Sequence, residues 1–203
     1  MKSELYDTYD YCRKTSLYIS GKILSGEFSS IDNHIICQMI KECRLINLFG
    51  HRRSKIYKNK LAGGLDCAQY HALLIYLYLT KNSPKSKKIA KNIFWGYVFR
   101  MGFSPCLTEL VLFKPQSMIL LFRMIWYLFP IYCLLWPFWR LWVEFNINTL
   151  NSETTTNKIS LLPTLYVLNE KMPSMGYIKE VYNIHFKNNQ RIGNALIKGL
   201  IGE

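Results

Sequence analysis

The residues best suited to catalysis are a cysteine and a histidine near position 70. Gly64, Leu65 and Asp66 lead into Cys67, and His71 follows four residues later. A cysteine at the start of a helix can have a lowered thiol pKa, because the positive end of the helix dipole stabilises the thiolate. This pattern suits a cysteine-dependent hydrolase or acyltransferase with Cys67 as its nucleophile.

The position of the histidine argues against that chemistry. Enzymes of this kind normally take the histidine from a distant strand, whereas His71 belongs to the same expected helix as Cys67. His185, in the strand-like stretch VYNIHF, is the only sequence-distant candidate, and a membrane span between the two would separate them. We therefore favour a core helix with a buried cysteine and a hydrogen-bonded histidine, and a protein that is not an enzyme.

The histidines and cysteines also lack the spacing of a metal site. The four histidines share no ligand spacing, and the acidic residues do not cluster with them. The six cysteines contain no CxxC pair, and five of them lie on the N-terminal, basic side of the chain. This is typical of free thiols in a reducing compartment. We predict no metal and no cofactor.

A charge-free run of sixteen residues between Arg123 and Arg140 is the most informative segment. A helix that is apolar on every side must be enclosed by lipid or by protein. The two arginines would lie about 26 Å apart along a straight helix, close to the ~30 Å thickness of a bilayer's hydrocarbon. We expect a membrane-embedded helix or helical hairpin, with a buried helix or hairpin of a soluble protein as the first alternative. A helix lying in the membrane interface is the least favoured, because it needs a polar face that this run lacks. Pro130 and Pro137 would kink a helix through this run.

Residues at both ends of this run are suited to the membrane interface. Arginine side chains can extend from the end of a span to the headgroups, and tryptophans concentrate at that level. Three tryptophans spaced by three residues gather at the C-terminal end of the run. The predicted interface residues are Arg123, Trp136, Trp139, Arg140 and Trp142.

Two basic runs, residues 51–60 and 81–91, could bind phosphate groups. Tyr57 lies inside the first run, and Phe94 and Trp95 follow the second. Lysines and arginines next to a membrane attract anionic lipid, and basic residues interleaved with aromatic ones also bind single-stranded nucleic acid. Lysines that only keep two loops soluble are a third interpretation. The candidate residues are Arg52, Arg53, Lys55, Lys58, Lys60, Lys85, Lys87, Lys88 and Lys91.

The distribution of charge predicts an orientation. The chain has 26 Lys and Arg against 13 Asp and Glu, a net charge of +13. Residues 1–116 carry 18 basic and 8 acidic side chains, whereas residues 144–203 carry 6 and 5. Basic flanks stay on the cytoplasmic side of a membrane, and the first fourteen residues contain no apolar signal-peptide core. We expect a membrane protein whose N-terminal part is cytoplasmic.

Helical periodicity and helix-capping residues predict a mainly α fold. We expect helices over residues 3–24, 31–48 and 66–80, another from Ser104-Pro105, a strand or helix near 177–186 and an amphipathic helix near 190–201. The expected parts are a basic helical domain (1–114), an apolar membrane-embedded segment (115–145), a polar linker (146–160) and a C-terminal appendage (161–203).

The function that we favour is non-enzymatic. The chain resembles no family that its motifs would identify, and we expect a small membrane-anchored accessory, assembly or immunity-type protein. Its basic cytosolic face would contact anionic lipid or a protein partner. The alternatives are a membrane-associated cysteine-dependent hydrolase or acyltransferase using Cys67, and a soluble, basic, helical nucleic-acid-binding protein.

Overall fold

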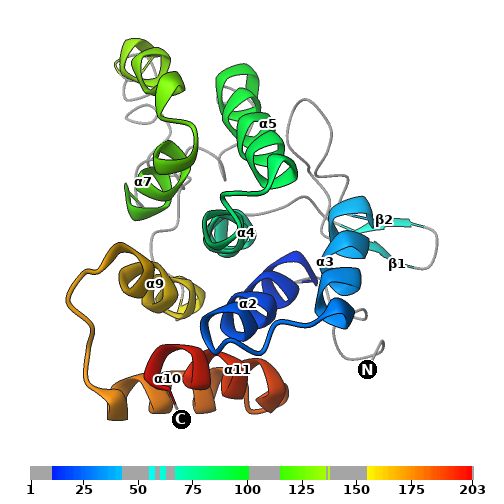
Figure 1. Ribbon diagram of the computed structural model, residues 1–203, viewed down its shortest axis with the longest axis vertical. Helices are drawn as coiled ribbons and strands as arrows, with labels where there is room; N and C mark the ends of the chain where they lie inside the picture. Colours follow the sequence, from blue (N-terminus) through cyan, green and yellow to red (C-terminus); the bar gives the residue numbers. More distant parts are fainter. Residues whose placement is uncertain are drawn as a thin grey trace.

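A computed structural model describes residues 11–42, 55–57, 60–62, 67–100, 115–135, 137 and 155–202. This part of the chain is mainly helical, as predicted (Figure 1). The helices are α2 (Tyr11–Leu24), α3 (Ser30–Glu42), α4 (Cys67–Leu79), α5 (Pro84–Arg100), α7 (Pro115–Met124), η2 (Trp126–Leu128), α9 (Thr155–Leu168), α10 (Met175–His185) and α11 (Gln190–Ile201). Two short antiparallel strands, β1 (Lys55–Tyr57) and β2 (Lys60–Ala62), pair Tyr57 with Lys60.

Helix α4 is the centre of the core. Its sequence carries no charge, and every side chain from Tyr70 to Leu77 is buried. A helix that is apolar on all sides needs neighbours all round, and here α2, α5, α7 and α9 pack against it. The segment at 66–80 was predicted to be a core helix, and the structure confirms a buried helix over Cys67–Leu79.

The first and last described helices, α2 and α11, pack closely against each other (Figure 1). Two glycines allow this approach: a Cβ placed at Gly21 would lie 2.6 Å from the backbone of Ala195, and one at Gly199 would lie 2.7 Å from the Gly21 carbonyl oxygen. Leu196 and Leu200 of α11 are buried in the same core as Leu17 and Ile19 of α2. The segment predicted to be a C-terminal appendage therefore contributes to the core of the N-terminal helices.

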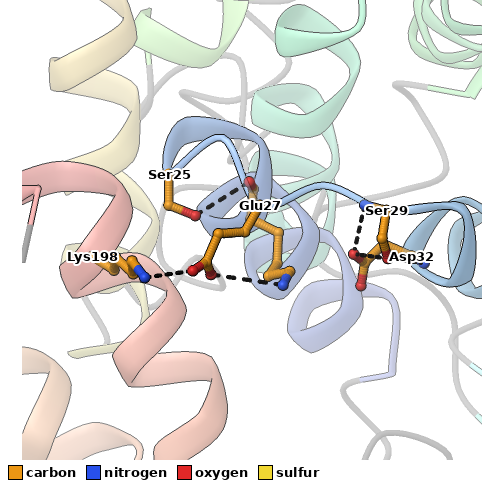
Figure 2. A network of polar contacts seen from close by, with 6 residues as sticks. Ser25, Glu27, Ser29, Asp32 and Lys198 are labelled. Atoms are coloured by element: carbon orange, nitrogen blue, oxygen red, sulfur yellow. Dashed lines mark hydrogen bonds and ion pairs between the residues drawn. The ribbon is translucent and has the colours of Figure 1, made fainter.

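Polar contacts fix the turn between α2 and α3 and join it to α11 (Figure 2). Ser29 caps α3: its backbone N–H and its hydroxyl donate to the Asp32 carboxylate at 2.9 and 2.7 Å. The Asp32 N–H in turn donates to the Ser29 hydroxyl at 3.4 Å, which gives the reciprocal arrangement of a capping box. Beside it, the Glu27 carboxylate pairs with Lys22 at 3.7 Å and with Lys198 of α11.

The predicted polar linker is partly wrong, because residues 155–160 are the first turns of α9. Their Thr, Asn and Ser side chains have modest helix propensity, but Ile159 and Leu162 are buried against the core. Tertiary burial outweighs local composition here. Pro163 lies inside α9, and the helix continues through it.

A long-range hydrogen bond explains how α9 tolerates Pro163. Proline has no N–H, so the carbonyl of Ile159, four residues earlier, loses its helical donor. The hydroxyl of Tyr182 in α10 donates to that carbonyl at 3.1 Å. Burial raises the pKa of Tyr182 well above its ordinary value of 10.0, so this hydroxyl remains a proton donor.

The start of α10 and the end of α11 each have a residue type that is common at that end of a helix. Helix α10 begins after Ser174, whose hydroxyl accepts from the Tyr177 N–H at 3.3 Å, and α11 ends at Gly202 with φ +81°. Residues 3–10, 43–48 and 104–114, all predicted to be helical, lie outside the described part of the chain.

Candidate functional site

His71, the predicted catalytic partner, lies in the core. It is 1% exposed, and its Nε2 atom lies 3.3 Å from the Thr164 hydroxyl of α9. Cys67 is the first residue of α4, as predicted. His185 ends α10 and is not in a strand, which corrects the strand-like interpretation of its surroundings. The arrangement of His71 is that of a hydrogen-bonded core residue, while the catalytic role of Cys67 stays a prediction.

The described residues contain no group of three or more His, Cys, Asp or Glu that could hold a metal ion. One hollow of about 400 Å³ lies between α10 and α11, beside Asn183, Gln190 and Asn194. The residues around it include no carboxylate, thiol or imidazole. It therefore offers hydrogen bonds but no general base.

The apolar run is bent. Within the described residues no single helix is long and apolar enough to cross a membrane, and one bent pair passes by length and composition. Its two parts, 118–124 and 126–135, meet at 110°. The bend is at Ile125, whose φ of −132° and ψ of 45° end the first part. Pro130 was expected to cause a kink, but it lies in the first turn after η2, where a missing N–H is tolerated.

Residues of the bent pair expose large apolar side chains. Trp126 is 75% exposed and Leu134 is 73% exposed, and Tyr127 and Phe129 are about half exposed. Contiguous exposed apolar residues usually mark a surface that another molecule or a membrane covers. We call these four residues the apolar tip. Of the predicted interface residues, Arg123 is exposed at the end of α7, and Trp136, Trp139, Arg140 and Trp142 lie outside the described residues.

The second basic run is helical and not a loop. It forms the first turns of α5, where Pro84 is the first helical residue. Ser86, Ile89 and Ala90 face the core, and the four candidate lysines of this run, Lys85, Lys87, Lys88 and Lys91, are all exposed. Three of them, Lys87, Lys88 and Lys91, recur at helical spacing and form one stripe, which we call the α5 lysine stripe.

The first basic run is described only in part. Lys55 lies in β1 and Lys60 in β2, while Arg52, Arg53 and Lys58 lie outside the described residues. That both runs form one surface stays a prediction.

Aromatic contacts join the α5 lysine stripe to the apolar tip. The Lys91 ammonium lies 5.6 Å from the centroid of the Tyr127 ring, within the range of a cation–π contact. Two further aromatic contacts link the same elements. The rings of Phe94 in α5 and Phe122 in α7 meet edge to face with 6.0 Å between their centroids, and the rings of Phe122 and Phe129 do so at 5.1 Å. Positive charge and exposed apolar surface therefore lie side by side.

Almost no negative charge accompanies this surface in the sequence. Between Asp66 and Glu144 the chain has nine Lys and Arg and one acidic residue, Glu109. Helix α5 has no acidic residue in its first turn to balance either its lysines or the positive end of its dipole. An anionic partner would satisfy both.

No protein-family model, curated protein or solved structure matches this chain. The functional argument therefore rests on the chemistry of this surface.

Proposed function

We propose that the protein is a small membrane-associated accessory protein that docks on anionic lipid through the apolar tip and the α5 lysine stripe. The observation that carries this proposal is the contact between Lys91 and Tyr127, at 5.6 Å. It keeps a cation beside an exposed aromatic ring, the combination that suits the boundary between headgroups and hydrocarbon.

The bend supports insertion into one leaflet. The two parts of the bent pair would measure about 10 Å and about 15 Å along their axes, against ~30 Å of hydrocarbon. With a bend of 110° between them, we propose that the tip enters one leaflet while α5 stays at the headgroups. The membrane-embedded segment predicted for 115–145 takes this shallower form in the proposal, with the basic side facing the cytoplasm.

The charge of the surface favours lipid as the partner. Basic side chains near an anionic membrane contribute about 1 kcal/mol each, and Lys87, Lys88 and Lys91 are all exposed on α5. The exposed Leu134 adds aliphatic area on which a nucleic-acid base cannot stack. A protein partner on the same face, the nucleic-acid alternative and the Cys67 alternative stay predictions.

Sedimentation with vesicles tests the proposal. The purified full chain should bind vesicles of phosphatidylcholine and phosphatidylserine and should ignore pure phosphatidylcholine. Changing Lys87, Lys88 and Lys91 together to Glu should weaken binding by at least about a hundredfold. The control changes the equally exposed Lys41, Lys171 and Lys187 to Glu. It alters net charge by the same amount and should weaken binding much less.

A second pair of variants tests the apolar tip. Leu134→Ser should reduce binding by about tenfold, because the side chain loses its favourable transfer out of water. Ile184→Ser, on α10, removes a side chain that is 67% exposed, and it should have no effect. Equal effects of the two variants, or complete displacement from vesicles by a little single-stranded oligonucleotide, would contradict lipid docking.

A further inference from the structure

We propose that Tyr78, Lys81 and Arg123 form a binding site for a phosphomonoester carried by a lipid headgroup. This inference rests on the proposed docking function and names the headgroup chemistry that the docked protein prefers. Tyr78 was not among the residues that the sequence singled out, and Lys81, the first residue of the second basic run, was not named as a candidate.

The three side chains come from different elements and converge on one atom. Arg123, at the end of α7, lies beside the Tyr78 hydroxyl near the end of α4, where its positive charge favours the ionised phenol. Lys81, in the turn before α5, has its ammonium 3.5 Å from the same oxygen and 4.5 Å from the centroid of the ring. The interaction with Arg123, followed by the contributions of Lys81 and against the opposing effect of burial, lowers the pKa of Tyr78 below its ordinary value of 10.0.

This cluster has two positive charges and no negative one. Neither Lys81 nor Arg123 forms an ion pair with a carboxylate among the residues that the structure describes. The phenol lies beside both cations but is itself a neutral group, so it does not compensate their two charges. Both cations are exposed, whereas Tyr78 is partly buried and so is held in place. An anion from solvent can therefore reach them.

The number and kind of donors favour a phosphomonoester. Such a group carries about −1.5 to −2 charges at neutral pH and three strong acceptor oxygens. The guanidinium of Arg123 can donate to two oxygens at once, while the ammonium of Lys81 and the hydroxyl of Tyr78 supply further donors. A phosphodiester has one charge and two free oxygens, so it would leave part of this set unsatisfied.

The position of the site points to a lipid. Arg123 lies two residues before the bend at Ile125, and the exposed Trp126 and Tyr127 follow directly. If the apolar tip enters a leaflet, Arg123 is at its base, where the headgroup phosphates lie. A dissolved phosphate compound would gain no binding free energy from Trp126, because it has no hydrocarbon in which that side chain could be buried.

Vesicles of matched surface charge test this site. The wild-type full chain should bind vesicles containing phosphatidic acid, a phosphomonoester lipid, about tenfold more tightly than vesicles containing phosphatidylserine. Tyr78→Phe and Arg123→Lys should abolish this preference while keeping the binding to phosphatidylserine. Tyr177→Phe removes the hydroxyl of an exposed tyrosine of α10, and it should keep the preference. The preference should also weaken as the pH falls below about 6, where a phosphomonoester loses its second charge.

The outcomes separate the two proposals. Binding to both acidic vesicles without preference, or a preference that survives Tyr78→Phe, would overturn the site but leave membrane docking intact. Displacement from phosphatidic acid vesicles by an equal concentration of inorganic phosphate would overturn the lipid as its source. Binding to neither kind of vesicle would overturn the site together with the docking function.

Discussion

The hydroxyl of Tyr182 donates to the carbonyl of Ile159 at 3.1 Å, and this is the carbonyl that Pro163 deprives of its helical partner. The bond joins α10 to α9, and Tyr182 is fully buried. A proline that would otherwise break α9 thus creates the acceptor that connects it to the next helix.

The first prediction concerns this bond. Tyr182→Phe should lower the free energy of unfolding by about 1–3 kcal/mol, because it leaves a buried carbonyl without a donor. In a Pro163→Ala background residue 163 regains its N–H, so the same change should cost about 1 kcal/mol less. Urea denaturation of the four proteins in this cycle measures the difference. An equal cost of Tyr182→Phe in both backgrounds would show that the Ile159 carbonyl does not depend on Tyr182.

The second prediction concerns the contact between α2 and α11. Gly199→Ala should destabilise the protein by about 1–3 kcal/mol, because overpacking forces the two backbones apart. The added Cβ would lie 2.7 Å from the Gly21 carbonyl oxygen. Gly176 of α10 has nothing within 4 Å of its Cβ position, so Gly176→Ala should be neutral or stabilise by up to about 1 kcal/mol. Urea midpoints that change alike for both variants would rule out a close approach at Gly199.

The third prediction concerns pH. The hydrogen bond from Lys198, with a further contribution from Lys22, holds the pKa of Glu27 below its ordinary value of 4.5 (Figure 2). A carboxylate with a lowered pKa in the folded state stabilises the protein above its unfolded-state pKa, and this stabilisation is lost as the pH falls through the folded-state value. Between about pH 5 and about pH 3, wild type should therefore lose more stability than Glu27→Gln.

The measurement for this third prediction is the urea midpoint at several pH values. High salt should shrink the difference between the two proteins, because Glu27 and Lys198 are both exposed. Glu180→Gln, which removes an exposed carboxylate of α10, should leave the pH profile of the wild type unchanged. Parallel profiles for wild type and Glu27→Gln would show that this pair is not linked to folding.

Much of the helical framework follows from local signals in the sequence. The periodicity that predicts helices at 66–80 and near 190–201 is confirmed by α4 and α11. Helix α5 was not predicted, because its first turns carry the second basic run. The beginning of α9 could not be predicted in this way. Its first residues are polar, and the burial of Ile159 depends on packing against segments that are distant in the sequence.

The candidate surface also contains residues that the sequence could predict and residues that it could not. The α5 lysine stripe and Arg123 were identified from the sequence, because charge beside an apolar run is visible along the chain. Tyr78 was not, because its hydroxyl meets Arg123 only after α4 and α7 have packed together. The contact of Lys91 with Tyr127 also depends on packing, since the bend at Ile125 was not expected.

The pairing of α2 with α11 also has a consequence for biosynthesis. Lys198 and Glu27 are 171 residues apart, so α2 leaves the ribosome long before its neighbour is made. At about 5–20 residues per second, the face of α2 that α11 covers remains without its partner for roughly 10 to 30 seconds. During that interval Gly21 and the apolar side chains around it are open to other contacts, and completion of the core depends on the arrival of the last helix.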